Sequence, residues 1–101
     1  MIDCDFLQQQ FENKAPVDET YFYFRSDSAE IEHYIGYLPE NVLPYWIGKC
    51  DIPGGCEFKS AGELFTTPVF DGKSLQQRWS DVELCAIGGM PVADWVKANI
   101  E

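Results

Sequence analysis

Short runs of apolar residues alternate with polar segments along the chain, and their spacing predicts the first elements. In residues 3–11 the apolar side chains share one helical face and acidic residues occupy the first turn, which predicts a short helix. The segment TYFYF at 20–24 consists of β-branched and aromatic residues, which predicts a strand buried on both faces.

A helical periodicity also covers residues 27–38. The apolar positions recur at spacings of three, four and seven: Ile31, Tyr34, Ile35 and Leu38. Asp27 can cap the start of this helix with Glu30 three residues on. Gly36 and Pro39 would end it. We therefore predict a helix whose second face carries polar residues: Glu30, His33, Tyr37 and Glu40.

The middle of the chain has the pattern of a hairpin. Residues 45–52 are rich in aromatic and β-branched positions and predict a strand. Pro53 sets φ for the first corner of a turn, and Gly54 tolerates the positive φ of the second. Residues 56–58 then form a short extended return.

Two capping-box patterns predict short helices. Ser60 with Glu63 opens a helix of one to two turns that Pro68 ends. Ser74 with Gln77 opens another, LQQRW.

The last third of the chain predicts a strand and a helix. VELCAI at 82–87 has the composition of a strand, and Gly88-Gly89 turns the chain. Pro91 suits the first position of a helix over 91–99. Its apolar stripe is Val92, Trp95, Val96 and Ile100.

Strands interspersed with short helices predict an α+β fold. We expect a single domain over residues 1–101, with a small, mostly antiparallel sheet covered by short helices. The 101 residues are 46% hydrophobic and 15% aromatic, which is enough for a core without disulfides and too apolar for a disordered chain.

Charge narrows the classes of partner. The net charge is −10, and residues 1–40 hold nine acids and two bases, a net −7. Nucleic acids and anionic membranes are poor partners because their phosphates would be repelled. A basic protein is a good partner because complementary fields speed encounter. The alternative is that the acidity only confers solubility.

The N-terminal segment predicts the compartment. MIDCDFLQQQ is acidic and lacks the apolar core of a secretory signal, and no run approaches the ~18 apolar residues of a membrane span. We therefore expect a cytoplasmic protein in a reducing environment.

The four cysteines do not have the spacing of a metal or redox motif. Cys4, Cys50, Cys56 and Cys85 contain no pair two residues apart, and His33 is the only histidine. We expect no metal and no cofactor. Cys50 and Cys56 could bond across the hairpin, but a reducing compartment favours small, mostly buried apolar thiols on either side of a turn.

His33 is the strongest candidate for acid–base catalysis. It could work with Glu30 or Glu32 and a nucleophile such as Cys50, but nothing in the sequence brings that nucleophile near it. Gly88-Gly89 before a helix is a weak phosphate-binding signal. We expect no catalytic residues and no enzyme activity.

The acidic first half is a better candidate for a binding surface. Tyrosine offers a large contact area with few rotatable bonds, and carboxylates offer charge. The residues that we predict to contact a partner are Asp18, Glu19, Asp27, Glu30, His33, Tyr37 and Glu40.

Three segments resemble a known family. YWIGKCDIPGGCEFKSAGELF, FDGKSLQQRW and AIGGMPVADWV, which span about residues 45–96, are similar to small acidic immunity proteins of bacterial contact-dependent growth inhibition systems. The resembling positions look like core and turn positions. They carry no catalytic signature.

The resemblance implies a cytoplasmic antidote that forms a 1:1 heterodimer with the C-terminal toxin domain of a secreted protein. Such toxins are often nucleases with basic clefts, so the implied function is to cover the active site of a ribonuclease. The alternatives are an acidic protein-binding adaptor, a nucleic-acid-mimic decoy, or a small enzyme that uses His33.

Overall fold

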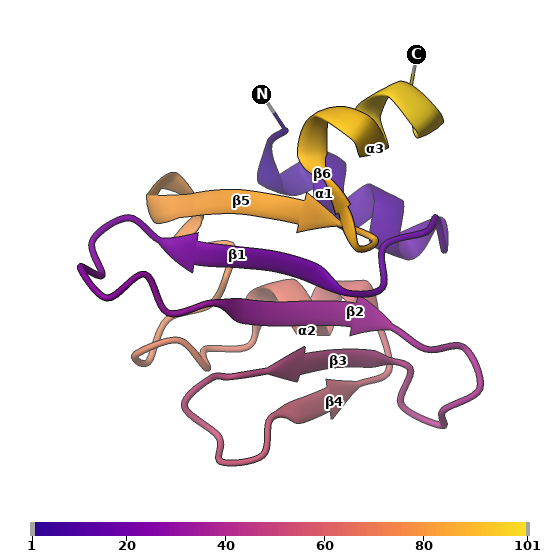
Figure 1. Cartoon of the computed structure of the whole chain (residues 1–101). Helices are drawn as coiled ribbons and strands as arrows, with labels where there is room; N and C mark the ends of the chain where they lie inside the picture. The colour runs from indigo at the N-terminus through magenta and orange to yellow at the C-terminus, as the bar shows by residue number, and fades with distance from the viewer. Residues whose placement is uncertain (1, 101) are drawn as a thin grey trace.

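A six-stranded antiparallel sheet forms the centre of the structure, a computed structural model that describes residues 2–100 (Figure 1). The strand order is β4-β3-β2-β1-β5-β6, and every neighbouring pair is antiparallel. The strands are β1 Thr20–Phe24, β2 His33–Tyr37, β3 Tyr45–Gly48, β4 Cys56–Phe58, β5 Val82–Ile87 and β6 Met90–Pro91. The two edge strands, β4 and β6, are only three and two residues long.

Three helices accompany the sheet: α1 Cys4–Glu12, α2 Ala61–Thr66 and α3 Val92–Asn99. Figure 1 shows α1 and α2 behind the sheet and α3 beside the β5–β6 edge. A single 3-10 turn, η1 Trp79–Asp81, leads into β5. The chain is therefore a single α+β domain, as the sequence predicted.

The core lies between one face of the sheet and the helices behind it. Strand alternation places Phe22, Ile35 and Ile47 on this face, each almost fully buried. Helices contribute the other side of the core: Leu7, Phe11, Leu64, Phe65 and Trp95.

Several local predictions are confirmed. The predicted helix over 3–11 is α1, although Asp3 is its N-cap and not part of its first turn, accepting a hydrogen bond from the backbone N–H of Phe6 at 2.7 Å. Ser60 caps α2 through the N–H of Glu63 at 3.1 Å. Strand β5 has the predicted bounds, 82–87.

The predicted helix over 27–38 is wrong. Residues 25–32 form a turn and His33–Tyr37 is strand β2, paired with β1 on one side and β3 on the other. The Asp27 side chain accepts from the N–H groups of Ala29 and Ile31, which closes a turn. The following HYIGY segment also fits a strand, and pairing on both sides buries Ile35 more fully than a surface helix would.

Smaller corrections concern element ends. Strand β3 ends at Gly48, not at residue 52, because Lys49 takes a left-handed φ of 41°. Ser74 and Gln77 do exchange the capping-box hydrogen bonds, at 3.0 and 2.8 Å, but the segment after them is a turn and then η1. Strand β1 is fully buried on one face only, since Tyr21 and Tyr23 keep some exposure.

The last helix also differs in detail. Pro91 is the N-cap of α3, which begins at Val92, one residue after the predicted start. Of the predicted stripe only Trp95 is fully buried, and its indole N–H donates to the carbonyl of Pro16 at 2.9 Å. Val92 and Val96 are partly buried, and Ile100 is 51% exposed.

Candidate functional site

The residues that the sequence suggested as one binding face lie at opposite ends of the sheet. Strands β1 and β2 are antiparallel, with Phe22 opposite His33 and Thr20 opposite Ile35. One end, to the left in Figure 1, holds Asp27, Glu30 and His33, and the other end holds Asp18, Glu19, Tyr37 and Glu40. The length of β2, about 14 Å from His33 to Tyr37, separates the two groups.

Burial differs within this set. Glu19, Glu30 and Glu40 are exposed, whereas the others are partly buried. Tyr37 packs on Tyr45 with ring centroids 4.8 Å apart, on the core side of the sheet. Tyr37 therefore has a packing role in addition to any contact with a partner.

Asp18 has a clear local role. Its Oδ1 accepts a hydrogen bond from the indole N–H of Trp46 at 2.8 Å and one from the backbone N–H of Tyr37 at 3.0 Å. Both Asp18 and the Trp46 ring lie against Gly36, where a Cβ atom would overlap them. The glycine therefore lets the carboxylate and the indole lie directly on the strand.

Trp46 belongs to the face of the sheet opposite α1 and α2, turned toward the viewer in Figure 1. Strand alternation places four partly exposed aromatic side chains on this uncovered face: Tyr21, Tyr23, Tyr34 and Trp46. Tyr21 and Tyr34 pack edge to face with centroids 5.0 Å apart. Tyr34 and Trp46 also flank Gly48.

Carboxylates border the uncovered face. Partial burial, and then the charges of Glu19, Glu32 and Asp18, raise the pKa of Tyr21. Partial burial and the charges of Glu30 and Glu83 raise the pKa of Tyr23, with an opposing effect of Arg25.

Cys85 reports the same electrostatic environment. The residue is exposed, but partial burial of its sulfur, followed by the charges of Glu32, Glu83 and Glu30, raises the pKa of the thiol. Arg25 is already paired with Glu83 at 3.1 Å. The uncovered face thus combines four aromatic rings with five carboxylates: Asp18, Glu19, Glu30, Glu32 and Glu83.

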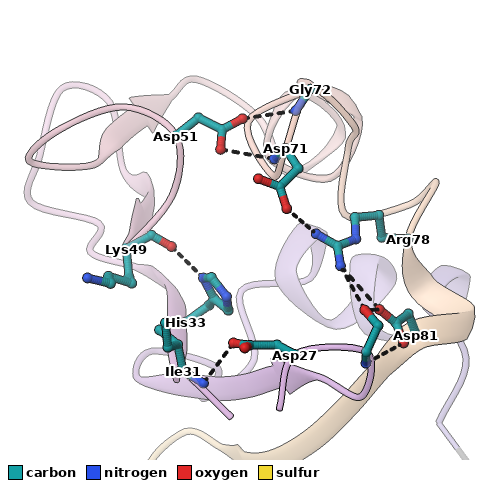
Figure 2. Close-up of polar contacts among 10 residues, drawn as sticks. Asp27, Ile31, His33, Lys49, Asp51, Asp71, Gly72, Arg78 and Asp81 are labelled. Atoms are coloured by element: carbon teal, nitrogen blue, oxygen red, sulfur yellow. Dashed lines mark hydrogen bonds and ion pairs between the residues drawn. The ribbon is translucent and has the colours of Figure 1, made fainter. Parts of the chain in front are cut away.

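The second feature is a pocket of about 490 Å³ at the end of the sheet that holds His33. The His33 ring packs against Phe22, Phe24 and Phe70, with centroid distances of 5.4, 5.0 and 5.4 Å. Its Nδ1 lies 2.6 Å from the carbonyl oxygen of Lys49. Figure 2 shows the imidazole pointing into the space between the 27–31 turn and the 71–72 loop.

Arg78 forms the opposite wall of this pocket. Its guanidinium lies 3.5 Å above the centroid of the Phe24 ring and pairs with Asp71 at 3.4 Å and Asp81 at 3.1 Å (Figure 2). Hydrogen bonds from Ser26, together with Arg78, lower the pKa of Asp81.

Asp51 fastens the loops that frame the pocket. Its two carboxylate oxygens accept from the N–H groups of Asp71 and Gly72 at 2.9 and 3.0 Å. These two hydrogen bonds lower the pKa of Asp51.

Cys50 also lines the pocket, so the structure brings it to the same cavity as His33. Cys50 and Cys56 are free thiols with sulfurs 3.9 Å apart. Burial and the neighbouring Cys50 raise the pKa of Cys56 to about 12. Across residues 2–100, no hydrogen bond joins the His33 ring to Cys50. The arrangement therefore lacks the direct base–thiol contact of an activated nucleophile.

Two further observations concern the part of the chain from residue 2 to residue 100. No group of three or more His, Cys, Asp or Glu side chains there is arranged to hold a metal ion. No helix there has the length and apolar character needed to cross a bilayer.

Comparison of the chain with protein-family models, with curated proteins and with solved structures gave no match.

Proposed function

We propose that this chain is an immunity protein that binds a cognate toxin domain and neutralises it by covering a basic active-site cleft, with a ribonuclease as the toxin. One observation carries the proposal: the uncovered face combines four aromatic side chains with a border of carboxylates. The toxin binds this face as one half of a 1:1 heterodimer. The inhibition is steric and electrostatic, without turnover.

The aromatic rings supply contact area. Tyrosine and tryptophan are enriched among the residues that dominate binding energy, because they bury a large surface and lose few rotamers. Tyr21, Tyr23, Tyr34 and Trp46 all retain partial exposure and lie on adjacent strands. A partner that covers them would remove apolar surface from water at the centre of the contact.

The carboxylates supply specificity and speed. A ribonuclease cleft binds phosphate with basic residues, and an opposing acidic surface raises the association rate. The base beside Tyr23 at this border is Arg25, and it is already paired with Glu83 at 3.1 Å. Asp18 holds Trp46, so the exposed carboxylates of Glu19, Glu30 and Glu32 are the ones that face a cationic partner.

The uncovered face is built on a rigid support. Asp18 fixes the Trp46 indole through one hydrogen bond and the β2 backbone through another. Side chains that are already fixed lose less entropy on binding. This favours a preformed docking surface over one that folds around its partner.

The other hypotheses fit this geometry less well. A decoy of nucleic acid needs charges at phosphate-like spacing over much of its surface, whereas here the carboxylates gather around aromatic rings. A general adaptor uses the same surface, so only the partner distinguishes it. An enzyme would need His33 to contact Cys50, and no hydrogen bond within residues 2–100 joins the two.

Co-expression tests the proposal. The C-terminal domain of a large secreted protein encoded beside this gene is induced in a bacterial host, with and without this chain. We expect the chain to restore growth and to copurify with the domain in equal amounts. Continued growth arrest, together with no complex by size-exclusion chromatography, would contradict the proposed function.

A matched pair of variants locates the surface. Glu32→Lys reverses a charge at the border of the uncovered face, whereas Glu12→Lys makes the same change on α1, behind the sheet. We expect Glu32→Lys to slow association about tenfold at low salt and Glu12→Lys to leave it near the wild-type rate. Equal rates for the two variants would move the binding surface elsewhere.

A further inference from the structure

The pocket at the His33 end of the sheet has walls that are fixed before any ligand arrives. Three separate segments meet there: the turn after β1, the loop after β3, and the loop that carries Phe70 and Asp71. Asp27 closes the first segment on itself, and Asp51 ties the second to the third. The cavity of about 490 Å³ is large enough for the end of a long side chain.

The hydrogen bond of His33 determines what its ring offers to a ligand. A carbonyl oxygen only accepts, so the Nδ1 that lies 2.6 Å from the Lys49 carbonyl carries the proton. In the neutral ring, Nε2 is then an acceptor. Figure 2 shows this imidazole pointing into the pocket, so its other nitrogen can accept a hydrogen bond from a ligand there.

The carboxylates around the pocket are acceptors as well. An ionised carboxylate has about four lone-pair sites. Asp27 uses two of them for the N–H groups of Ala29 and Ile31, and Asp51 uses two for Asp71 and Gly72. Each therefore keeps acceptor capacity in a fixed orientation.

The basic residues of the pocket do not offset this preference for a ligand that donates hydrogen bonds. The Arg78 guanidinium is shared between Asp71 and Asp81, so it is not free to bind an anion. Lys49 contributes its backbone carbonyl to His33, and Figure 2 shows its side chain extending away from the space between His33 and Arg78. The polar groups left for a ligand are acceptors above an aromatic floor of Phe24 and Phe70.

We infer that this pocket receives the guanidinium of an arginine side chain from the protein partner, donating hydrogen bonds to His33 Nε2 and to the carboxylates of Asp27 and Asp51. The inference rests on the proposed function for the source of that side chain. Its chemistry has a precedent within the molecule, since Arg78 already lies flat on Phe24 between two carboxylates.

Arginine fits better than lysine or an anion. A planar guanidinium has five donors that can reach acceptors on several walls at once and can stack on the aromatic rings. An ammonium is a compact point charge that would leave much of the cavity unfilled. An anion would meet three aspartates on the pocket lining: Asp27, Asp51 and Asp71.

The turn between β1 and β2 connects the pocket to the uncovered face. Glu30 and Glu32 of this segment border the uncovered face, and Asp27 and Ile31 line the pocket. One basic partner can therefore contact both, with its surface on the sheet and one arginine around the turn.

Titration with N-acetyl-arginine amide, followed by NMR of the ¹⁵N-labelled full chain, tests the pocket without the toxin. N-acetyl-citrulline amide is the matched probe, because it has the same shape without the charge. We expect the arginine compound to shift the resonances of Asp27, His33 and Lys49 at millimolar concentrations and the citrulline compound to leave them nearly unchanged. Equal shifts from both compounds, or shifts confined to other residues, would overturn the inference.

Two variants at the pocket and one away from it complete the test. Asp27→Asn keeps an oxygen for the turn but removes the charge, and His33→Phe keeps the aromatic packing but removes Nε2. We expect each to weaken binding of the arginine compound about fivefold or more, while Glu40→Gln at the opposite end has no effect. Amide spectra of the free variants establish that the fold is retained. Undiminished binding by both pocket variants would overturn the inference.

The two proposals fail separately. Glu32→Lys should slow association with the toxin, while its pocket resonances should still shift with N-acetyl-arginine amide, because Glu32 does not line the pocket. If the arginine compound fails to bind while the toxin copurifies, the pocket inference is wrong and the proposed function stands. If the compound binds and the toxin does not copurify, the proposed function is wrong and the pocket lacks its assigned source of arginine.

Discussion

The Asp18 carboxylate accepts a hydrogen bond from the indole N–H of Trp46 at 2.8 Å, across the face of strand β2. The two residues are 28 positions apart in the chain. This contact fixes the largest aromatic side chain of the uncovered face and is the basis of the first prediction.

Replacement of Asp18 by alanine should destabilise the fold. It leaves the Trp46 indole N–H and the Tyr37 backbone N–H without their acceptor, at a cost of about 2 kcal/mol in the free energy of unfolding. Urea unfolding followed by tryptophan fluorescence measures this change. Glu19→Ala, at the neighbouring exposed acid, should stay within about 0.5 kcal/mol of wild type. Similar losses for both variants would show that the hydrogen bonds contribute little.

Gly36→Ala should also destabilise the fold. Its Cβ would overlap the Asp18 carboxylate and the Trp46 ring, and relief of such overlap costs about 1–3 kcal/mol. Gly62→Ala is the matched control, because a Cβ in helix α2 meets only atoms at 3.8 Å or beyond. We expect it to be neutral or stabilising, since alanine is the better helix former. Thermal unfolding of both variants measures the difference, and a stable Gly36→Ala protein would contradict the described packing.

The thiol of Cys85 should react slowly despite its exposure. Burial and the carboxylates raise its pKa, so less thiolate is present at pH 8. Glu32→Gln removes the largest of those charge effects and should speed alkylation by iodoacetamide about two- to threefold. Glu40→Gln, at the opposite end of the sheet, is the control. Mass spectrometry of peptides follows each cysteine, and equal rates in both variants would contradict the assigned electrostatics.

The same experiment bears on the enzyme hypothesis. Cys56, with a pKa of about 12, should remain almost unmodified at pH 8. Preferential, rapid alkylation of Cys50 would instead indicate an activated thiol in the His33 pocket and would favour catalysis over binding.

Lowering the pH should destabilise the loops around the pocket, because protonation of Asp51 weakens the two hydrogen bonds that join them. The pKa of Asp51 in the folded chain lies below its ordinary value of 3.8, because two backbone N–H groups hold the ionised form. Its contribution to stability is therefore present above pH ~4 and lost as the pH falls toward the lowered pKa. Unfolding by urea between pH 7 and pH 2.5 should show a shallower loss for Asp51→Asn than for wild type. Parallel curves would contradict the assignment.

Local signals in the sequence were sufficient for most elements of the fold. Apolar spacing with acidic residues in the first turn predicted α1, a capping box predicted the start of α2, and composition predicted β5. Strand β2 was missed because its residues fit two periods at once. Ile31, Tyr34 and Ile35 have helical spacing, while His33, Ile35 and Tyr37 alternate as a strand. Non-local pairing with β1 and β3 decides between the two, and one sequence does not reveal it.

The candidate site was predictable only in part. Charge pointed to Glu19 and Glu30, which do border the uncovered face. Tyr21 and Tyr23 were assigned to a strand buried on both sides, and strict alternation in TYFYF would have exposed them. The pocket was not predictable, because His33, Asp51 and Arg78 come from segments that meet only in the folded chain.

The brevity of strands β4 and β6 restricts how another chain can attach. Very short edge strands are one way in which sheets resist strand addition, and here β4 has three residues and β6 has two. Lateral growth by strand addition, whether with a second copy or in misassembly, is therefore disfavoured. Recognition is left to side chains, so its selectivity can change by substitution without disturbing the backbone that displays them.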